Sequence, residues 1–595
     1  MEKNNSQEYL LSLRHSTEHI LMQAMENLYP KIIKAMGPAT EDGFYFDFEL
    51  DEKISKTDFP KIEKEMQKII KEDLPITHKE IKIDAAKKLF KYNPYKQEWL
   101  DEIESKKEIP NVYWTGDKFV DLCKGPHLKS TGKIKAFKLL SVAGAYWHGN
   151  EKNKMLTRIY GTAFPTQKEL DEYLNMLEKA KTRDHRVIGK DLDLFVFSDL
   201  IGKGLPLLTP NGTIIRRELE RFVIDEETKW NYQHVITPPL AKTDLYKKSG
   251  HYPYYKDSMY PKMKVDEEEL ILRPMTCPHH FMLYKSKPHS YKELPIRYAE
   301  IASQFRYEKS GELSGLMRVR MFCLADAHIF ASQDQAKDEI KNVLNLIDFV
   351  NGKLGLVKGI DYRYQLSLGN RTDTQKYYKD DKAWDSAENI LRQVLTETKN
   401  SFSEAPNEAA FYGPKIDIQM KKIGGKEETA FTVQYDFVMP KRFELTFIDK
   451  NGKEKELVVI HRSSIGAFER TMAFLLEKFA GALPVWLSPV QVQIIPISEN
   501  HLKYAQKIKE ALSSANIRVC VDEKNETMQS KIRNAQLQKI PYMIIVGDKE
   551  LSQENISVRL RNGKNINNIN LKNFIVDITK IVADKSLECI SSDTY

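Results

Sequence analysis

The sequence predicts a multidomain protein that combines α+β and α/β domains. Its 595 residues suffice for three to five domains of roughly 100–200 residues each. A charged, helix-forming stretch at 169–190 separates two regions of mixed strands and helices. From about Trp486 onward, short apolar strands alternate with helices, which is typical of an α/β domain with a mostly parallel sheet. We expect three domains and a helical linker, and their ranges are 1–166, 167–191 (the linker), 192–485 and 486–595.

Composition and charge exclude several classes of protein. Hydrophobic residues make up 41% and charged residues 29%, as in globular domains rather than disordered or fibrous chains. No apolar stretch reaches the roughly 18–20 residues that span a bilayer, and the first residues lack the apolar segment of a secretory signal. Five cysteines, an odd number, fit a reducing compartment. We expect a cytoplasmic protein with no membrane partner, and its net charge of +7 permits a polyanionic partner without requiring one.

The first region is predicted to begin with a helix at 7–28, because its apolar residues recur at helical spacing. Three short segments are strand-like, at 43–48, 119–122 and 136–140. The stretch at 169–190 contains no glycine before Gly189 and predicts one long, solvated helix.

The second and third regions contain further expected elements. Thr213 follows an Asn-Gly turn and is expected to cap a helix, and a strand at 234–237 precedes a Pro-Pro break. A helix is expected at 466–479. The third region alternates strands and helices, at 490–495, 501–514, 517–522, 528–538 and 542–546.

One cluster of titratable residues is predicted in the first region. His15 and His19 lie four residues apart, so both imidazoles project from one face of the expected helix, and Cys123 and His127 are also four apart. These four side chains could bind zinc or move protons around a water molecule. Spacing alone leaves both roles open, together with the alternative that the pairs are incidental.

A second candidate cluster is dispersed along the chain. Cys277, His328 and His461 each lie in, or at the edge of, an expected strand. One cysteine and two histidines would leave a fourth zinc position open, as in catalytic or substrate-binding sites. From spacing alone, three unrelated core residues remain the favoured interpretation.

A third candidate set consists of arginines. Arg306 and Arg318 are expected on two paired strands, joined by the loop at 309–314, and Arg470 lies near the start of an expected helix. The guanidinium fork matches phosphoryl oxygens, although a salt-bridged sheet face would also explain any one of them. Neither a P-loop nor a G-x-G-x-x-G fingerprint is present, so a nucleotide would bind by another route.

Several motifs in order resemble one family. Four segments resemble the editing domain of bacterial-type threonyl-tRNA synthetases: Arg14–His19 (RHSTEH), Cys123–His127 (CKGPH), Gly144–Trp147 (GAYW) and Arg158–Ala163 (RIYGTA). The remaining chain resembles that family's class II catalytic core, built on an antiparallel sheet, and its α/β anticodon-binding domain. The resemblance covers about 7–580 and implies ATP-dependent ligation of L-threonine to tRNA(Thr) through a threonyl-adenylate.

The resemblance implies roles for the arginines in ATP binding with Mg²⁺. In the family, the arginine at Arg306 bridges the ATP α-phosphate and the amino-acid carboxylate, and Arg318 contacts the γ-phosphate. The implied ATP-binding residues are Arg306, Glu308, Arg318, Phe322, Gln434 and Arg470. Arg306, Arg318 and Arg470 are also the implied catalytic residues, because charge builds on the phosphoryl oxygens in the reaction. The segment before Pro238 resembles class II motif 1, which implies a homodimer.

Zinc is the implied cofactor for amino-acid selection. If Cys277, His328 and His461 hold one Zn²⁺ per subunit, its open position can take the amino and hydroxyl groups of threonine. Asp326 is expected to orient that hydroxyl and Tyr412 the amino group. An apolar pocket alone would separate threonine from isosteric valine by only about 100-fold.

Serine keeps the hydroxyl and would pass this selection, so the resemblance implies a second site that hydrolyses seryl-tRNA(Thr). The implied editing residues are His15, His19, Cys123, His127, Asp121 and Lys96. We expect them to position a water molecule rather than zinc, since the family's editing site is usually described as metal-free. The implied anticodon-binding residues are Asn525, Arg533, Glu550 and Arg559.

Two departures from the family pattern stand out. Leu324 and Ala325 occupy positions where a glutamine and an aspartate are usual, so binding of the substrate carboxylate is expected to depend more on Arg306. Compared with many bacterial members, we expect the small N-terminal domain to be missing, since the sequence begins almost directly at the His15 helix. Leu324 motivates one rival hypothesis, an RNA-binding regulator that no longer aminoacylates. A second rival is a metal hydrolase acting through the His15 cluster.

Overall fold

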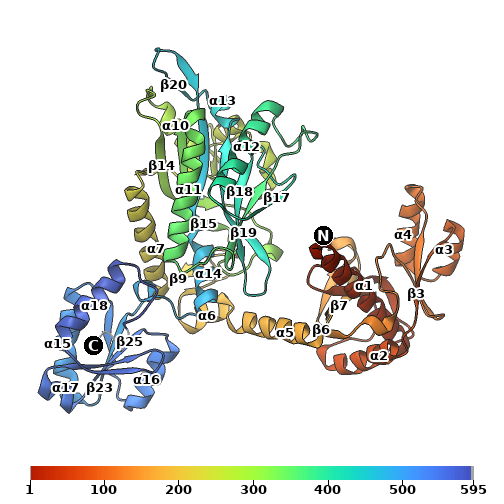
Figure 1. The fold of residues 1–595 in the computed structure, drawn as a ribbon, viewed down its shortest axis with the longest axis horizontal. Coiled ribbons are helices and arrows are strands. Elements are labelled where there is room, and N and C mark those ends of the chain that lie inside the picture. The colour runs from red at the N-terminus through yellow and green to blue at the C-terminus, as the bar shows by residue number, and fades with distance from the viewer. Residues whose placement is uncertain (1, 591–595) are drawn as a thin grey trace. The chain divides into compact units, whose positions relative to one another are not determined.

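The computed structural model describes residues 2–590 and separates the chain into two compact units, 1–178 and 179–595. Each unit packs helices against β-sheets, and elements are labelled in Figure 1. None of the described helices combines the length and the apolar character needed to cross a membrane. The predicted multidomain class is confirmed, while the finer division at 166, 191 and 485 stays a prediction.

The first unit packs two helices on a four-stranded sheet with antiparallel neighbours. Phe44, Phe46 and Phe48 alternate along one strand, and all three are buried in a core shared with Ile20 and Leu21 of the first helix. The helices are α1 (Glu2–Leu28) and α2 (Phe59–Lys71), and the strands in sheet order are β1 (Ile33–Met36), β2 (Phe44–Glu49), β7 (Met155–Phe164) and β6 (Ala136–Tyr146). The helix expected at 7–28 and the strands expected at 43–48 and 136–140 are confirmed.

A smaller layer of the same unit carries the cysteine of the first cluster. Its elements are β3 (Ile76–Glu80), α3 (Ile83–Leu89), α4 (Pro94–Ser105), β4 (Asn111–Thr115) and β5 (Phe119–Leu122). The three strands pair antiparallel in the order β3-β4-β5. Cys123 follows β5 directly, and the expected strand at 119–122 is confirmed.

The expectation of one long helix at 169–190 was wrong. The structure has two helices, α5 (Gln167–Thr182) and α6 (His185–Asp191). Asp184 leaves the helical conformation with ψ 124° and caps α6, because its side chain accepts a hydrogen bond from the Arg186 amide. A charged composition without glycine did not reveal this break, since an aspartate can itself begin a new helix.

The second unit is built around an eight-stranded sheet. Its inner six strands pair antiparallel with their neighbours, and the two outermost strands are added in parallel. In sheet order they are β10 (Gln233–His234), β14 (Ile296–Phe305), β15 (Met321–Ala331), β22 (Val458–Ala467), β19 (Glu427–Asp436), β18 (Lys415–Lys421), β16 (Tyr362–Ser367) and β17 (Phe402–Ala405).

Helices and small sheets surround this large sheet, and α11 runs along it in Figure 1. The helices are α7 (Pro210–Lys229), α8 (Thr243–Ser249), α9 (His251–Tyr254), α10 (Cys277–Lys285), α11 (Gln333–Lys353), α12 (Asp381–Glu397), α13 (Met439–Phe443) and α14 (Phe468–Phe479). The strands of the small sheets are β8 (Phe195–Val196), β9 (Leu207–Leu208), β11 (Leu240–Lys242), β12 (Met263–Val265), β13 (Glu268–Leu272), β20 (Thr446–Ile448) and β21 (Glu454–Glu456).

Three expected boundaries in this unit were wrong. Thr213 does not cap α7: Thr209 does, because its hydroxyl accepts a hydrogen bond from the Gly212 amide and Pro210 stands at the first helical position. The expected strand at 234–237 is shorter, since β10 ends at His234. The helix expected from Gly466 begins at Phe468, because β22 continues through Ala467.

The C-terminal part has a five-stranded mixed sheet rather than a mostly parallel one. Its strands in order are β24 (Val519–Val521), β23 (Val492–Pro496), β25 (Tyr542–Val546), β26 (Ile556–Leu560) and β27 (Asn565–Ile569). The first three are parallel, as expected, and the last two add an antiparallel hairpin that the sequence pattern did not reveal. The helices are α15 (Leu502–Ser514), α16 (Met528–Leu537), α17 (Asp548–Gln553) and α18 (Leu571–Ala583).

Candidate active sites

The structure brings Cys277, His328 and His461 together in the second unit. His328 on β15 and His461 on β22 are directly opposite each other in the antiparallel register. Cys277 is the first residue of α10, so its expected place in or beside a strand was wrong. One possible ligand atom from each residue lies within 4.8 Å of the others, and all three side chains are buried. One sulfur and two imidazoles suit zinc with a position left open.

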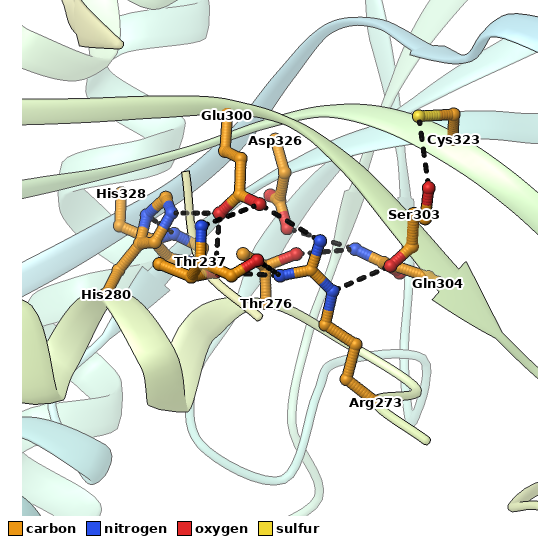
Figure 2. A network of polar contacts seen from close by, with 10 residues as sticks. All are labelled: Thr237, Arg273, Thr276, His280, Glu300, Ser303, Gln304, Cys323, Asp326 and His328. Carbon is orange, nitrogen blue, oxygen red and sulfur yellow. Dashed lines mark hydrogen bonds and ion pairs between the residues drawn. The ribbon is translucent and has the colours of Figure 1, made fainter. Parts of the chain in front are cut away.

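Buried polar groups lie behind both histidines, and Figure 2 shows those behind His328. His280 Nδ1 lies 2.9 Å from His328 Nδ1, and its Nε2 lies 3.2 Å from the Glu300 carboxylate. On the other side, His461 Nε2 is 2.9 Å from Asp436 Oδ2. Each of the two histidines therefore has one ring nitrogen occupied by a protein partner, which leaves its other nitrogen available to a metal.

Glu300 remains ionised although it is buried. Burial alone would raise its pKa, but hydrogen bonds from His280 and Thr237 and the charge of Arg273 lower the pKa of Glu300 to about 2. Arg273 Nη2 lies 3.0 Å from Glu300, and the Thr237 hydroxyl donates to the same carboxylate at 2.7 Å. The carboxylate thus contacts donors from three residues at once (Figure 2).

The residues expected to orient threonine lie beside the cluster. Burial raises the pKa of Asp326, and its carboxylate accepts a hydrogen bond of 3.2 Å from the Gln304 amide. The Tyr412 ring stacks on His461 with 5.1 Å between ring centroids, and its hydroxyl donates to Gln434. Asp326 and Tyr412 therefore lie at the cluster, and Gln434 contacts this tyrosine.

Leu324 lies in an apolar part of the sheet. It is opposite Ala302 on β14 and Ala467 on β22. Its neighbour Ala325 is fully buried. A leucine side chain here offers no hydrogen bond to a substrate, so polar recognition must come from other residues.

The arginines of the third candidate set surround one loop. Arg306 follows β14 directly, donates from Nε to the Pro274 carbonyl at 3.3 Å, and lies 5.1 Å from the centre of the Phe322 ring. Burial lowers the pKa of Arg306, but a guanidinium stays charged in proteins. Arg470 donates from Nε to the Met317 carbonyl at 3.0 Å.

The expected strand for Arg318 was wrong. Residues 314–318 form a turn closed by a hydrogen bond from the Met317 amide to the Ser314 carbonyl, and β15 begins only at Met321. Arg318 is exposed in this loop and pairs with Glu308 at 2.9 Å. Arg318 and Glu308 therefore form an ion pair within the loop, and neither residue lies on a strand.

Sequence reasoning missed His185, which holds the same loop in place. Its Nε2 accepts a hydrogen bond of 3.1 Å from the Leu316 amide, and its Nδ1 lies 2.7 Å from Glu477 on α14. Gly315 leaves room for the ring, because a Cβ there would lie 2.2 Å from His185 Nε2. The short segment Asp184-His185-Arg186 carried no signal for this contact, since the loop and α14 are far away in the chain.

In the first unit, the four residues of the other cluster also come together. Cys123 Sγ lies 3.2 Å from His15 Nε2 and 3.2 Å from His127 Nε2. The His19 and His127 rings lie 4.2 Å apart between centroids. A cavity of about 420 Å³ opens beside the cluster, with His15, His19 and Cys123 in its wall. One ligand atom from each of the four residues falls within 4.8 Å of the others.

Burial keeps this cluster uncharged. It raises the pKa of Cys123 to about 12 and lowers the pKa of His15, His19 and His127 below the usual histidine range. At neutral pH the group is therefore a thiol and three neutral imidazoles. Neutral imidazoles can accept a proton from a water molecule.

A buried ion pair adjoins the cavity. Lys96 Nζ contacts Asp121 Oδ2 at 2.8 Å, and both side chains are nearly inaccessible. Glu18 lies on α1 between the two histidines, and sequence reasoning missed it. Neither of its oxygens has a hydrogen-bond partner among residues 2–590, and burial raises its pKa well above the usual value.

The comparisons with known proteins agree with this arrangement. Residues 260–479 match the tRNA synthetase class II core domain (G, H, P, S and T). Residues 491–581 match the anticodon binding domain, and 111–160 match the threonyl and alanyl tRNA synthetase second additional domain. The threonine–tRNA ligase of Geobacillus sp. (strain WCH70) is 50% identical over 566 residues, covering 95% of this chain and 87% of that protein. This chain belongs to the threonyl-tRNA synthetase family.

Further relatives support the assignment. The threonine–tRNA ligase of Staphylococcus epidermidis is 48% identical over 575 residues, covering 96% of this chain and 88% of that protein. A crystal structure of the RNA binding domain of threonyl-tRNA synthetase from Cryptosporidium parvum Iowa II shares 33% identity with a TM-score of 0.63, covering 68% of this chain and 99% of that one. The chain is thus a class II aminoacyl-tRNA synthetase that charges tRNA(Thr), and its second additional domain indicates editing of mischarged tRNA.

The residues expected to contact the anticodon are spread over the C-terminal part of this synthetase. Asn525 lies exposed in the loop before α16, and Arg533 is exposed on that helix. Arg559 on β26 donates to Asn565 at 3.1 Å. The Glu550 carboxylate accepts hydrogen bonds from the Gly547 amide and Ser557 hydroxyl, so it also stabilises the start of α17.

Proposed function

We propose that the second unit ligates L-threonine to tRNA(Thr) through a threonyl-adenylate at the site formed by α10, β14, β15 and β22. The observation that carries this proposal is the meeting of Cys277, His328 and His461 within 4.8 Å of one another. They are far apart in the sequence, and neither their order nor their spacing would bring them together without the class II sheet.

The three residues fit zinc by their chemistry. A thiolate and two imidazoles are preferred zinc ligands, and each imidazole has one nitrogen engaged by His280 or Asp436 and the other free. Zinc held by Cys277, His328 and His461 would offer an open position to the amino and hydroxyl groups of threonine. That requirement for a hydroxyl excludes valine more strongly than an apolar pocket would.

The chain's own residues position the two substrates. Asp326 accepts the hydroxyl proton of threonine in a hydrogen bond, and Tyr412 holds the amino group. Arg306 lies over Phe322 and neutralises the charge that builds on the α-phosphate when the carboxylate attacks, with Mg²⁺ bound to ATP assisting. Because Leu324 has no polar group, Arg306 also carries most of the binding of the substrate carboxylate.

The loop at 308–318 and α14 complete the ATP site. Arg318 contacts the γ-phosphate and Glu308 the adenine amino group, once ATP replaces their mutual ion pair. Arg470 covers the other face of adenine and fixes the loop through the Met317 carbonyl. Gln434, which accepts the Tyr412 hydroxyl, connects the ATP and threonine positions.

The first unit hydrolyses seryl-tRNA(Thr) in its 420 Å³ cavity. His15, His19, Cys123 and His127 position a water molecule, and a neutral imidazole takes its proton as it attacks the ester carbonyl. The carbonyl carbon forms a bond to the water oxygen and then releases the tRNA ribose oxygen, which regains a proton. Lys96 and Asp121 orient the seryl amino group. The four anticodon candidates, Asn525, Arg533, Glu550 and Arg559, select tRNA(Thr) in the C-terminal part.

A homodimer is the proposed assembly. Ile236 precedes the Pro-Pro break with 97% of its surface exposed, and Leu200 is 99% exposed. Large aliphatic side chains this exposed favour a protein interface. The proposed partners are tRNA(Thr), L-threonine and ATP, which are the substrates of the ligase. The cytoplasm is the proposed location.

Threonine-dependent exchange of pyrophosphate into ATP tests the ligation site. Wild type loaded with zinc is expected to be active, and Arg306→Ala to lose at least 1,000-fold, or about 4 kcal/mol of transition-state stabilisation. Arg363→Ala removes a half-buried arginine from the same sheet, where it pairs with Glu427, and serves as the control. No exchange by the zinc-loaded wild type would contradict the proposal.

A metal ion in the first unit is a second candidate, because four possible ligands also meet there. Elemental analysis separates the two arrangements. We expect one zinc per wild-type chain and none in Cys277→Ala. One zinc remaining in Cys277→Ala, and lost in Cys277→Ala/Cys123→Ala, would favour a metal hydrolase over a water held by protein groups alone.

A further inference from the structure

A continuous chain of buried hydrogen bonds runs from Arg273 to the candidate metal ligand His328 (Figure 2). Arg273 pairs with Glu300, which also accepts from Thr237, and Glu300 contacts His280 Nε2. His280 Nδ1 then contacts His328 Nδ1 at 2.9 Å. The side chains of Arg273, Glu300, His280 and His328 are each at most 4% exposed, so water does not compete for these contacts.

The positions of the protons follow from the partners. Glu300 is a carboxylate because it faces the Arg273 guanidinium at 3.0 Å, so it can only accept hydrogen bonds. His280 must then carry its proton on Nε2 and donate it to Glu300. A neutral His280 has a bare Nδ1, which is an acceptor.

The same logic passes to the next ring. A contact of 2.9 Å between two ring nitrogens requires one donor, and His280 Nδ1 is the acceptor. His328 therefore carries its proton on Nδ1, which leaves the lone pair of its Nε2 free. That is the form of imidazole that binds a divalent metal through Nε2.

The alternative protonation can be judged from the charges. A doubly protonated His280 would donate from both nitrogens and would force the proton of His328 onto Nε2, which would block metal binding there. Arg273 already balances the single negative charge of Glu300. A second cation beside Glu300, in a buried site that must also hold Zn²⁺, would be electrostatically unfavourable.

We propose that Glu300 and His280 are positioning residues that fix the tautomer of His328 and so prepare it as a metal ligand. This inference rests on the proposed zinc site. The other histidine needs no such relay, because Asp436 faces His461 Nε2 directly at 2.9 Å and leaves Nδ1 for the metal. The two ligands thus use different ring nitrogens. Asp436 directly leaves Nδ1 of His461 for the metal, whereas Glu300, acting through His280, leaves Nε2 of His328.

Two substitutions at His280 separate proton placement from packing. The amide oxygen of His280→Asn can take the acceptor place of Nδ1, whereas His280→Leu fills similar volume without an acceptor. His289→Leu is the control, because His289 is equally buried on the segment after α10 but contacts Glu293 and the Tyr284 carbonyl instead. All variants are made in the full-length chain.

Zinc affinity is measured by competition with a chromogenic chelator, and Co²⁺ substitution gives a thiolate-to-metal absorption band as a second readout. We expect His280→Leu to bind zinc about 10–100-fold more weakly and to show an altered Co²⁺ spectrum. His280→Asn and His289→Leu are expected to remain within about threefold of wild type, far from the 10–100-fold range.

The possible failures can be told apart. If wild type binds no zinc, the proposed metal site fails and this inference fails with it. If wild type binds zinc and Cys277→Ala loses it, but His280→Leu keeps wild-type affinity, only the relay is overturned. Equal losses in His280→Leu and His280→Asn would show that packing, not proton placement, accounts for the effect, and would also overturn the relay.

Discussion

Replacing His185 by leucine is expected to weaken ATP use by the synthetase without altering the residues that face ATP. The ring joins the Leu316 amide to Glu477 on α14. Leucine removes a charge-assisted hydrogen bond worth roughly 1.5–3 kcal/mol and leaves a buried amide unpaired, at a cost of about 1–3 kcal/mol. The loop that carries Arg318 would lose one of its anchors.

Only part of this energy should appear in catalysis, because Arg470 still holds the Met317 carbonyl at 3.0 Å. We expect kcat/KM for ATP to fall about 10–100-fold, which corresponds to about 1.4–2.8 kcal/mol. The assay is pyrophosphate exchange with ATP and threonine varied separately. KM for threonine should change much less, because His185 contacts Leu316 and Glu477 and neither Tyr412 nor Asp326.

Asp184→Ala is the matched control. It removes the cap of α6, worth about 1 kcal/mol, but leaves the contacts of His185 with Leu316 and Glu477. A His185→Leu enzyme that is folded by circular dichroism and retains wild-type kcat/KM for ATP would refute the reasoning. A drop of the same size in Asp184→Ala would assign the effect to α6 stability instead.

Three further predictions concern the first unit. Cys123→Ala should let seryl-tRNA(Thr) accumulate while threonyl transfer stays near wild type; unchanged mischarging would contradict its editing role. Glu18→Gln should stabilise the unit at pH 8 but not at pH 4. Because the pKa of Glu18 is raised in the folded state, the wild-type protein loses stability as the pH rises above the pKa of this carboxyl in the unfolded state. Parallel urea melts at the two pH values would check this. Lys96→Met should destabilise the unit by about 3–5 kcal/mol in urea melts, and Lys96→Met/Asp121→Asn should recover most of that loss; an additive double variant would argue against a coupled pair.

The sequence was sufficient for elements with a strong local pattern. The strands at 119–122 and 542–546 have the predicted limits. The first begins directly after Lys118, and the second is an apolar run between Pro541 and Gly547, which mark its ends. The break at Asp184 and the cap at Thr209 were missed, because more than one nearby polar residue could cap each helix. The hairpin of β26 and β27 was missed although β26 alternates apolar and polar residues, because asparagine occupies three of the five positions of β27 and hides its pattern.

The candidate sites could be predicted only as residue types. His328 and His461 meet because β15 and β22 pair in one register, and no local pattern encodes that register across 132 intervening positions. His280 and Glu300 lack any motif of their own as positioning groups. They became visible only when β14, β15 and α10 were placed together, which is a tertiary property (Figure 2).

Burial has opposite chemical consequences at the two sites. In the second unit, Glu300 and Arg273 stay charged because each neutralises the other, and Arg306 stays charged because a guanidinium does not lose its proton. Such a site is suited to an anionic nucleotide and a divalent metal. In the first unit, burial leaves Cys123 and the imidazoles neutral, and the charge of Lys96 beside them is balanced by Asp121. A neutral cluster can still take a proton from water, which is what ester hydrolysis requires. The difference in charge therefore favours adenylate formation at one site and hydrolysis at the other, although histidine and cysteine dominate both.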